Sequence, residues 1–177
     1  MTIKNLDKLM KRINQLQKIT STREFEKIVS RNNKAIVQAN AKLLAPVNNG
    51  ELRNSINADT EIKGSSIIAS TYTNKQQALY VEFGTGPKGQ ANHEGISPNV
   101  NVSYSQHGWG IPADKVDSSD ALRYKWPKRV YQGKEYYMTS GQAAQPFLYP
   151  ALKNNETKVI NRIAKDLKKK IKEGVSK

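Results

Sequence analysis

The sequence of 177 residues predicts an α+β fold, in which a small, mostly antiparallel sheet packs against a long N-terminal helix and a C-terminal helix. Three observations favour this class. Apolar residues recur every three or four positions near both ends of the chain, and the pattern changes to short strand-like stretches around Lys63-Gly64. The segment 87–140 is rich in Gly, Pro, Asn and Ser and contains a second hairpin pattern. A chain of this length buries one core, so we expect a single domain over residues 22–177.

Two helical stripes precede the predicted sheet. An amphipathic pattern over residues 3–19 predicts an N-terminal extension, residues 1–21, that extends outward or packs on a neighbouring copy. The capping box Ser21-Thr22-Arg23-Glu24 opens the second stripe, which ends near Leu44 or Ala45 because Pro46 disfavours helical backbone in the residue before it. A third stripe, with lysines on the opposite face, predicts a C-terminal helix over 146–175.

The middle of the chain predicts two hairpins. The first has strands at about 52–62 and 65–73, and the second has its turn at Gln132-Gly133. The eight residues QQALYVEF fit either a short helix or a third strand. Because 87–140 is too long for a plain connection, we expect an elaborated insertion, partly ordered and partly mobile, that carries partner contacts.

The net charge of +14 is concentrated at the two ends of the chain. Residues 1–53 carry +7 and residues 153–177 carry +6, whereas residues 54–152 carry +1. Basic surfaces of this kind meet phosphates, acidic proteins or anionic lipids. The alternative is that these lysines and arginines are the solvated faces of two helices.

No residue pattern requires catalysis, so we expect a protein that is not an enzyme and needs no cofactor or metal. Cysteine is absent, which excludes disulfides, cysteine-ligated zinc and thiol nucleophiles. His93 and His107 lie fourteen positions apart and fall short of a zinc ligand set, and Ser118, Ser119 and Asp120 are neighbours only in sequence. The sequence contains no run of 18 apolar residues and opens without a secretory signal, so we expect no membrane partner.

The stretch Gly84-Thr85-Gly86-Pro87-Lys88-Gly89 matches the spacing G-x-G-x-x-G. A dinucleotide loop needs a strand before the glycines and a helix after them to hold the pyrophosphate. The segment after Gly89 contains Gly95 and Pro98 and no helical stripe. We therefore interpret the glycines as a tight turn.

Three blocks stand in a specific order along the chain: APVNNGELRNSI at 45–56, YVEFGTG at 80–86 and QAAQPFLYPAL at 142–152. Together they resemble the neck and tail-completion family of long-tailed bacteriophages, which includes head–tail connector and minor tail components. The matching positions are Ala45, Pro46, Gly50, Leu52, Arg53, Ser55 and Ile56 in the first block, Tyr80, Val81, Glu82, Phe83, Gly84, Thr85 and Gly86 in the second, and Pro146, Phe147, Leu148, Pro150, Ala151 and Leu152 in the third.

This resemblance implies a structural virion protein whose copies assemble in a ring at the neck or head-proximal end of the tail, to join or complete it. It implies that the partners are the protein itself and other neck, connector and tail-tube proteins. It also implies that the protein is located in the host cytoplasm before assembly and in the virion afterwards.

Several motif residues have a physical interpretation. Gly84 and Gly86 allow positive φ, and Phe83 and Phe147 are expected core residues. Glu82 is expected to pair with Arg53. Pro146 and Pro150 set the start of the last helix, where proline is tolerated.

The rival hypothesis is a non-sequence-specific nucleic-acid-binding protein that uses its basic helices. The run RYKWPKRVY combines Arg123, Lys125, Lys128 and Arg129 with aromatic residues, and Lys168, Lys169 and Lys170 add charge near the C-terminus. The two hypotheses meet if these residues contact partners or non-specifically contact genomic DNA in the channel of a ring.

Overall fold

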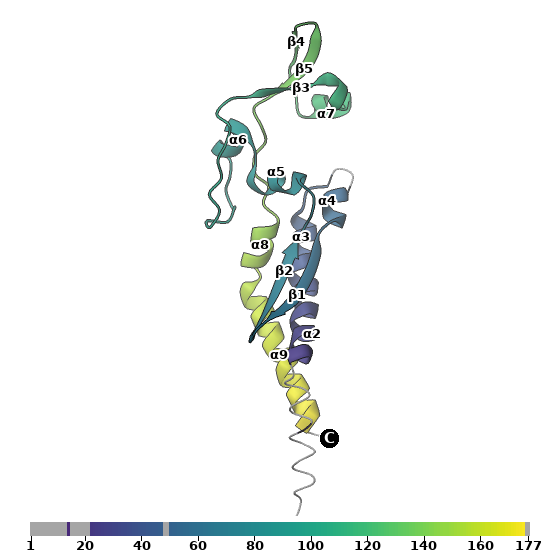
Figure 1. Ribbon diagram of the computed structural model, residues 1–177, viewed down its shortest axis with the longest axis vertical. Coiled ribbons are helices and arrows are strands. Elements are labelled where there is room, and N and C mark those ends of the chain that lie inside the picture. Colours follow the sequence, from purple (N-terminus) through teal and green to yellow (C-terminus); the bar gives the residue numbers. More distant parts are fainter. Residues whose placement is uncertain (1–13, 15–21, 48–49, 176–177) are drawn as a thin grey trace, which may run out of the picture. The chain divides into compact units, whose positions relative to one another are not determined.

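The computed structural model describes residue 14 and residues 22–47 and 50–175 (Figure 1). By its internal contacts the chain divides into two compact units, which we call unit 1 (Met1–Asn74 with Pro150–Lys177) and unit 2 (Lys75–Tyr149). Apart from Asn14, the predicted extension of residues 1–21 lies outside the described residues. The single domain predicted over residues 22–177 stays a prediction.

Unit 1 is built from a long helical run, a two-stranded hairpin and the C-terminal helix, which lies beside the helical run (Figure 1). Its elements are α2 (Thr22–Asn32), η1 (Asn33–Gln38), α3 (Ala39–Leu44), α4 (Glu51–Asn54), β1 (Asn57–Lys63), β2 (Ser66–Tyr72) and α9 (Glu156–Val175). The hairpin is antiparallel, from Asn57 opposite Tyr72 to Lys63 opposite Ser66. The predicted α+β class is confirmed, with a second antiparallel sheet in unit 2.

The predicted helix over 22–44 is present, with a π-helical segment, η1, in its middle. The helix ends where expected, because Ala45 before Pro46 has extended backbone at φ −61° and ψ 126°. Asn33 at the start of η1 is buried, and its side chain donates to Ser70 O at 3.0 Å and accepts from Thr71 Oγ1 at 3.2 Å. The amide of Asn33 thereby fixes the helical run against β2.

The first strand begins later than predicted. Residues from Glu51 to Asn54 form the short helix α4, and β1 starts at Asn57 rather than near residue 52. Gly50 lies before α4 at φ +83°, a conformation that glycine adopts at little cost. Leu52 and Ile56 point into the core, so the apolar alternation that indicated a strand comes instead from one helical turn and the residue leading into β1.

Unit 1 is held together by apolar packing and one polar cluster between α2 and α9. Asp166 Oδ2 on α9 accepts hydrogen bonds from Arg31 Nη2 at 2.8 Å and Asn32 Nδ2 at 2.9 Å. Asn32 is buried and also donates to Ile28 O at 2.9 Å. The hydrogen bonds from Asn32 and Arg31 lower the pKa of Asp166. The carboxylate therefore joins the two helices in its charged form.

Replacing Asp166 by alanine is expected to lower the unfolding free energy at pH 7 by about 1–2 kcal/mol, because the buried Asn32 amide loses an acceptor. The folded pKa is lowered below the ordinary value near 3.9, so this stability is present above pH about 4 and is lost as the pH falls through the folded pKa. Urea unfolding at pH 7 and pH 3 checks this, since the difference between wild type and variant should shrink at pH 3.

The matched control is Glu173→Ala on the same helix, whose exposed pair with Lys169 at 3.9 Å should contribute less than about 0.5 kcal/mol. A loss for Asp166→Ala that is no larger than the control, or that is the same at both pH values, would contradict this account.

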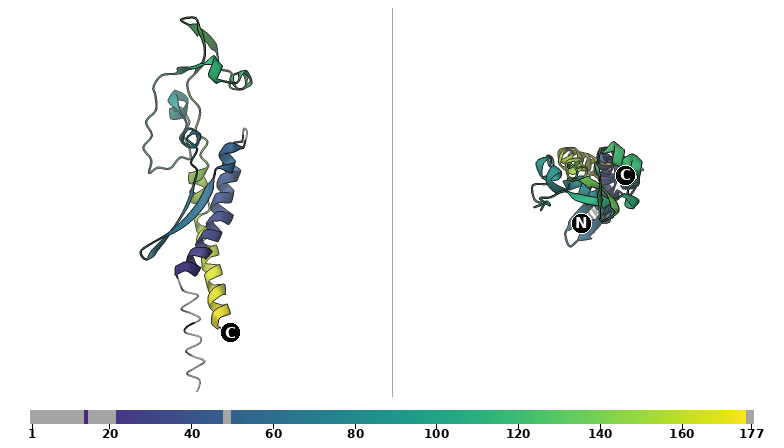
Figure 2. Two further views of the ribbon diagram at one scale, coloured as in Figure 1. Left: turned by 45° about the vertical axis from the view of Figure 1, so that its right-hand side comes forward. Right: turned by 90° about the horizontal axis from the view of Figure 1, so that it is seen from above.

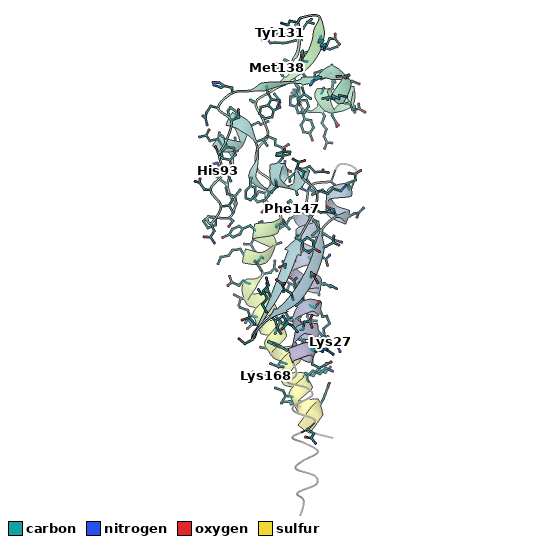
Figure 3. All side chains as sticks on the ribbon, viewed as in Figure 1. Lys27, His93, Tyr131, Met138, Phe147 and Lys168 are labelled. Carbon is teal, nitrogen blue, oxygen red and sulfur yellow. The ribbon has the colours of Figure 1, made fainter. Side chains whose placement is uncertain are left out.

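Unit 2 contains three short α-helices, one 3-10 helix and a three-stranded antiparallel sheet in the order β3-β5-β4. Its elements are α5 (Gln77–Phe83), α6 (Gly86–Ala91), β3 (Trp109–Pro112), η2 (Ala113–Lys115), α7 (Ser118–Arg123), β4 (Lys128–Tyr131) and β5 (Lys134–Thr139). The second predicted hairpin is confirmed: Gln132 at φ +48° and Gly133 at φ +76° form its two-residue turn, with Tyr131 beside it (Figure 3). The stretch QQALYVEF is helical rather than a strand.

The C-terminal helical segment begins later than predicted and is interrupted. Helix α8 (Leu148–Lys153) spans the division between the units, and α9 follows after a turn at Asn154-Asn155. The Asn155 side chain donates to Ala151 O at 3.0 Å, so a side-chain donor occupies this backbone acceptor at the end of α8. This local bond competes with a continuous helix and accounts for the break.

Candidate functional site

The second sequence block and residues 142–149 of the third meet in unit 2, and we call this the motif junction. Thr85 and Gln142 form an antiparallel bridge in which Thr85 N–H donates to Gln142 O at 3.0 Å and Gln142 N–H donates to Thr85 O at 3.2 Å. Gln145 N–H donates to Val81 O at 2.7 Å, and Gln142 Nε2 donates to Tyr80 O at 2.7 Å. The two ends of the 87–140 insertion are therefore closed on each other.

Glu82 is the central polar residue of the motif junction. It is only 4 % exposed, and its carboxylate accepts three backbone hydrogen bonds. Oε2 accepts from the N–H groups of Phe147 at 2.7 Å and Leu148 at 2.9 Å, and Oε1 accepts from Tyr149 N–H at 2.9 Å. These donors belong to the first turn of α8, where helix N–H groups lack partners within the helix.

The capping of α8 is complete because of Pro150. The four N–H positions without intrahelical partners are those of Phe147, Leu148, Tyr149 and residue 150. Glu82 satisfies the first three, and the fourth position is proline, which has no N–H. A negative charge at this end also interacts favourably with the helix dipole. Glu82 is thus the N-terminal cap of a helix 65 residues or more further along the chain.

Sequence reasoning found Glu82 but expected Arg53 as its partner. The partners that the structure gives its carboxylate are backbone N–H groups, and Arg53 Nη2 contacts Ala45 O at 3.5 Å in unit 1. A pairing of Arg53 with Glu82 would join two different units, so it stays a prediction.

The glycines of the motif junction sit where backbone segments cross at close range. Gly84 and Gly86 have the positive φ that was predicted, +74° and +61°. A Cβ on Gly84 would lie 2.8 Å from Ala144 N, and a Cβ on Gly86 would lie 2.7 Å from Ser140 O. The tightest position is Gly141, where an added Cβ would meet Thr85 O at 1.8 Å, and sequence reasoning missed it.

The interpretation of the glycines as a turn needs one correction. A six-residue helix, α6, does start at Gly86, although no helix was expected there. The element before the glycines is helix α5 rather than a strand, so the strand–turn–helix arrangement of a dinucleotide site is absent from this part of the chain.

Phe147 and Phe83 differ in their burial. Phe147 is 0 % exposed, as expected for a core residue (Figure 3). Phe83 is half-buried and lines an open groove of about 800 Å³ in unit 2. Both tryptophans, Trp109 and Trp126, also line this groove, and its lining contains no charged side chain. Tyr104 also lines the groove, and its hydroxyl group donates a hydrogen bond to Phe83 O at 2.8 Å. Burial raises the pKa of Tyr104.

The first sequence block forms a separate cluster in unit 1. Leu52 is buried, and Ser55 Oγ donates to Leu52 O at 2.8 Å and shares a hydrogen bond with Thr73 Oγ1 at 2.6 Å. With Pro46 ending α3 and Gly50 starting α4, this block turns the chain from the helical run into β1. The structure therefore joins the second and third blocks in one site, and within unit 1 the first block forms a structural corner.

The residues considered for chemistry have structural roles. Asp117 caps α7 by accepting from Ser119 N–H at 2.8 Å, which lowers the pKa of Asp117, and Ser118, Ser119 and Asp120 form the first turn of that helix. The His93 ring stacks on Tyr104 with centroids 5.7 Å apart. Within the described ranges, His, Asp and Glu side chains form no group of three suited to hold a metal ion.

Two of the basic residues predicted as nucleic-acid or partner contacts, Arg123 and Lys128, contact neighbours in unit 2. Lys128 Nζ pairs with Glu135 at 2.6 Å, a bond that raises the pKa of Lys128, and lies 6.0 Å from the Tyr137 ring centroid. Arg123 lies 5.8 Å from the Tyr124 ring centroid, and Tyr124 stacks on Trp126. Lys125 and Arg129 are exposed nearby. Lys168, Lys169 and Lys170 are exposed on α9 in unit 1, in the other part of the chain.

Comparison with known proteins finds a family model that covers the first sequence block and most of the second. Residues 7–84 match the family model described as "Bacteriophage HK97-gp10, putative tail-component", which confirms the resemblance drawn from the motifs and supports a structural role as a phage tail component. No curated protein and no solved structure matches the chain. Over the residues that the structure describes, no helix has both the length and the apolar character needed to cross a membrane.

Proposed function

We propose that copies of this protein form a ring at the neck or head-proximal end of the phage tail, and that this ring joins or completes the tail. Residues 7–84 of the chain are similar to phage tail components. The observation that carries the proposal is this match, which includes the first sequence block in unit 1 and ends at Gly84 in the motif junction. On this proposal the protein acts through interfaces, and its partners are further copies and other neck and tail-tube proteins.

The motif junction suits such a role because it holds the insertion at both ends. Thr85 and Gln142 close the segment between them by paired backbone bonds, and Glu82 anchors the helix after it. A segment displayed from a fixed base is typical of binding loops. On the sheet of this segment, Val130 and Tyr131 are exposed to solvent, and we propose that they contact neighbouring tail proteins.

Deletion of the gene from its phage tests this function. We expect filled heads and tails that are separate, or tails with aberrant ends, in electron micrographs of lysates, and complementation with the wild-type gene should restore joined particles. Complementation with Lys27→Ala, a change at an exposed residue of α2 outside the motif junction and the insertion, should restore them as well. Normal infectious particles without the gene would contradict the proposal.

A further inference from the structure

Among the described residues, the β1–β2 hairpin presents one uncovered face, which we call the hairpin outer face: Asp59, Glu61, Lys63, Ile68, Ser70 and Tyr72. On this face Lys63 Nζ pairs with Glu61 Oε1 at 2.8 Å. Asp59 is directly opposite Ser70 and Glu61 is opposite Ile68, so these side chains share one side of the sheet. The other side faces α2 and η1, against which both strands pack (Figure 2). Ile68 and Tyr72 are 40 % and 46 % exposed, and the face is hollowed by about 430 Å³ between the two carboxylates and these apolar side chains.

Among the described residues, helix α9 presents a second uncovered face, which we call the α9 outer face: Asn161, Lys165, Lys168 and Lys172. All four side chains are exposed (Figure 3 labels Lys168). Their spacing of three, four or seven residues places the three lysines along one side of the helix. The ion pairs of α9 among the described residues involve Glu156, Asp166, Lys169 and Glu173 and leave these three lysines unpaired.

We propose that the hairpin outer face of one copy docks on the α9 outer face of a second copy. The charges are complementary: Asp59 has no ion pair among the described residues, Glu61 is shared with Lys63, and both carboxylates would face three ammonium groups. Their spacing also agrees: Asp59 and Glu61 are two strand residues apart, about 6.6 Å, and Lys165 and Lys168 lie about 5–6 Å apart on the helix. Ile68 and Tyr72 would supply an apolar centre bordered by the ion pairs, as in other protein interfaces.

The two faces are different surfaces of the same unit, so the contact is head-to-tail. A head-to-tail contact closes into a ring when its rotation allows, and the inference rests on the ring of the proposed function. The net charge of +14 makes copies repel at long range. At physiological ionic strength this repulsion is screened beyond about 8 Å, so the contacts between opposite charges decide the interaction at close range.

Cysteine cross-linking in assembled particles tests the proposal, because the chain contains no cysteine of its own. Ser70→Cys lies beside Asp59 on the hairpin outer face, and Asn161→Cys lies four residues before Lys165 on the α9 outer face. Phage carrying both changes should give a ladder of covalent oligomers under oxidising conditions, with each single variant giving at most dimers. Ser70→Cys with Lys27→Cys, on exposed α2, is the matched control and should give no ladder.

The outcomes separate this inference from the proposed function. Infectious particles that contain the doubly substituted protein and show no ladder would overturn the docking surface and leave the tail role intact. Infectious particles that lack the protein would overturn both the docking surface and the proposed tail role.

Charge reversal gives a second, independent measurement. Asp59→Lys with Glu61→Lys, or Lys165→Glu with Lys168→Glu, should each reduce incorporation into particles by on the order of 100-fold, because like charges then meet across the contact. Combining all four changes should restore incorporation. No rescue, or a defect confined to the lysine variants together with weakened DNA binding, would overturn the proposal and favour a nucleic-acid partner for α9.

Discussion

A Gly141→Ala variant is expected to lose about 3–5 kcal/mol of unfolding free energy in unit 2, or to fail to fold that unit. Gly141 has φ +94°, and an added Cβ would lie 1.8 Å from Thr85 O, a backbone atom of the paired bridge. The bridge must therefore separate. Denaturant unfolding followed by tryptophan fluorescence measures the effect, because both tryptophans, Trp109 and Trp126, are in unit 2.

Gly133→Ala is the matched control for this prediction. Gly133 also has positive φ, +76°, but an added Cβ would meet nothing within 4 Å. Its alanine variant should lose only the backbone strain of about 1–2 kcal/mol. Equal losses at the two positions would mean that the close crossing at Thr85 is not a constraint.

Glu82→Ala is the second change with a large expected effect. It leaves three N–H groups at the start of α8 without acceptors, beside the fully buried Phe147. An unsatisfied buried donor costs about 1–3 kcal/mol, and of these three groups the Phe147 N–H is buried and the other two are part-buried, so we expect a total loss of about 2–4 kcal/mol in the same fluorescence measurement. Particle assembly should fall with it, since the helix after the insertion loses its cap.

Two further variants interpret the Glu82 result. Glu82→Gln keeps one acceptor oxygen and should lose less than Glu82→Ala. Glu94→Ala removes an exposed carboxylate outside the motif junction and should change stability by less than about 0.5 kcal/mol. A Glu82→Ala variant as stable as Glu94→Ala would refute the capping role.

Local pattern predicted much of the fold. The helical stripe ended before Pro46, and the turn at Gln132-Gly133 was correct, because both depend on residues close in sequence. The start of β1 was wrong, since alternating apolar residues fit either a strand or the short α4 with its following residue. The break at Asn154-Asn155 was missed, because it depends on one side-chain bond to Ala151 O.

The site was predicted in part, and the missing part is long-range. The sequence identified Glu82, Phe147 and the glycines, and Phe147 is buried as expected. It did not indicate that Thr85 pairs with Gln142, 57 positions away, nor that Glu82 caps α8. Both contacts depend on the pairing of the two ends of the 87–140 insertion, which are far apart in the sequence. The crowding at Gly141 follows from the same closure.

The location of the protein in the virion tests the central claim most directly. Gold-labelled antibody against this protein, applied to purified particles and viewed by electron microscopy, should mark a single position where head and tail meet. Label at that junction would support a ring that joins or completes the tail. Label along the tube, at the distal tip, or absent from infectious particles would contradict the account.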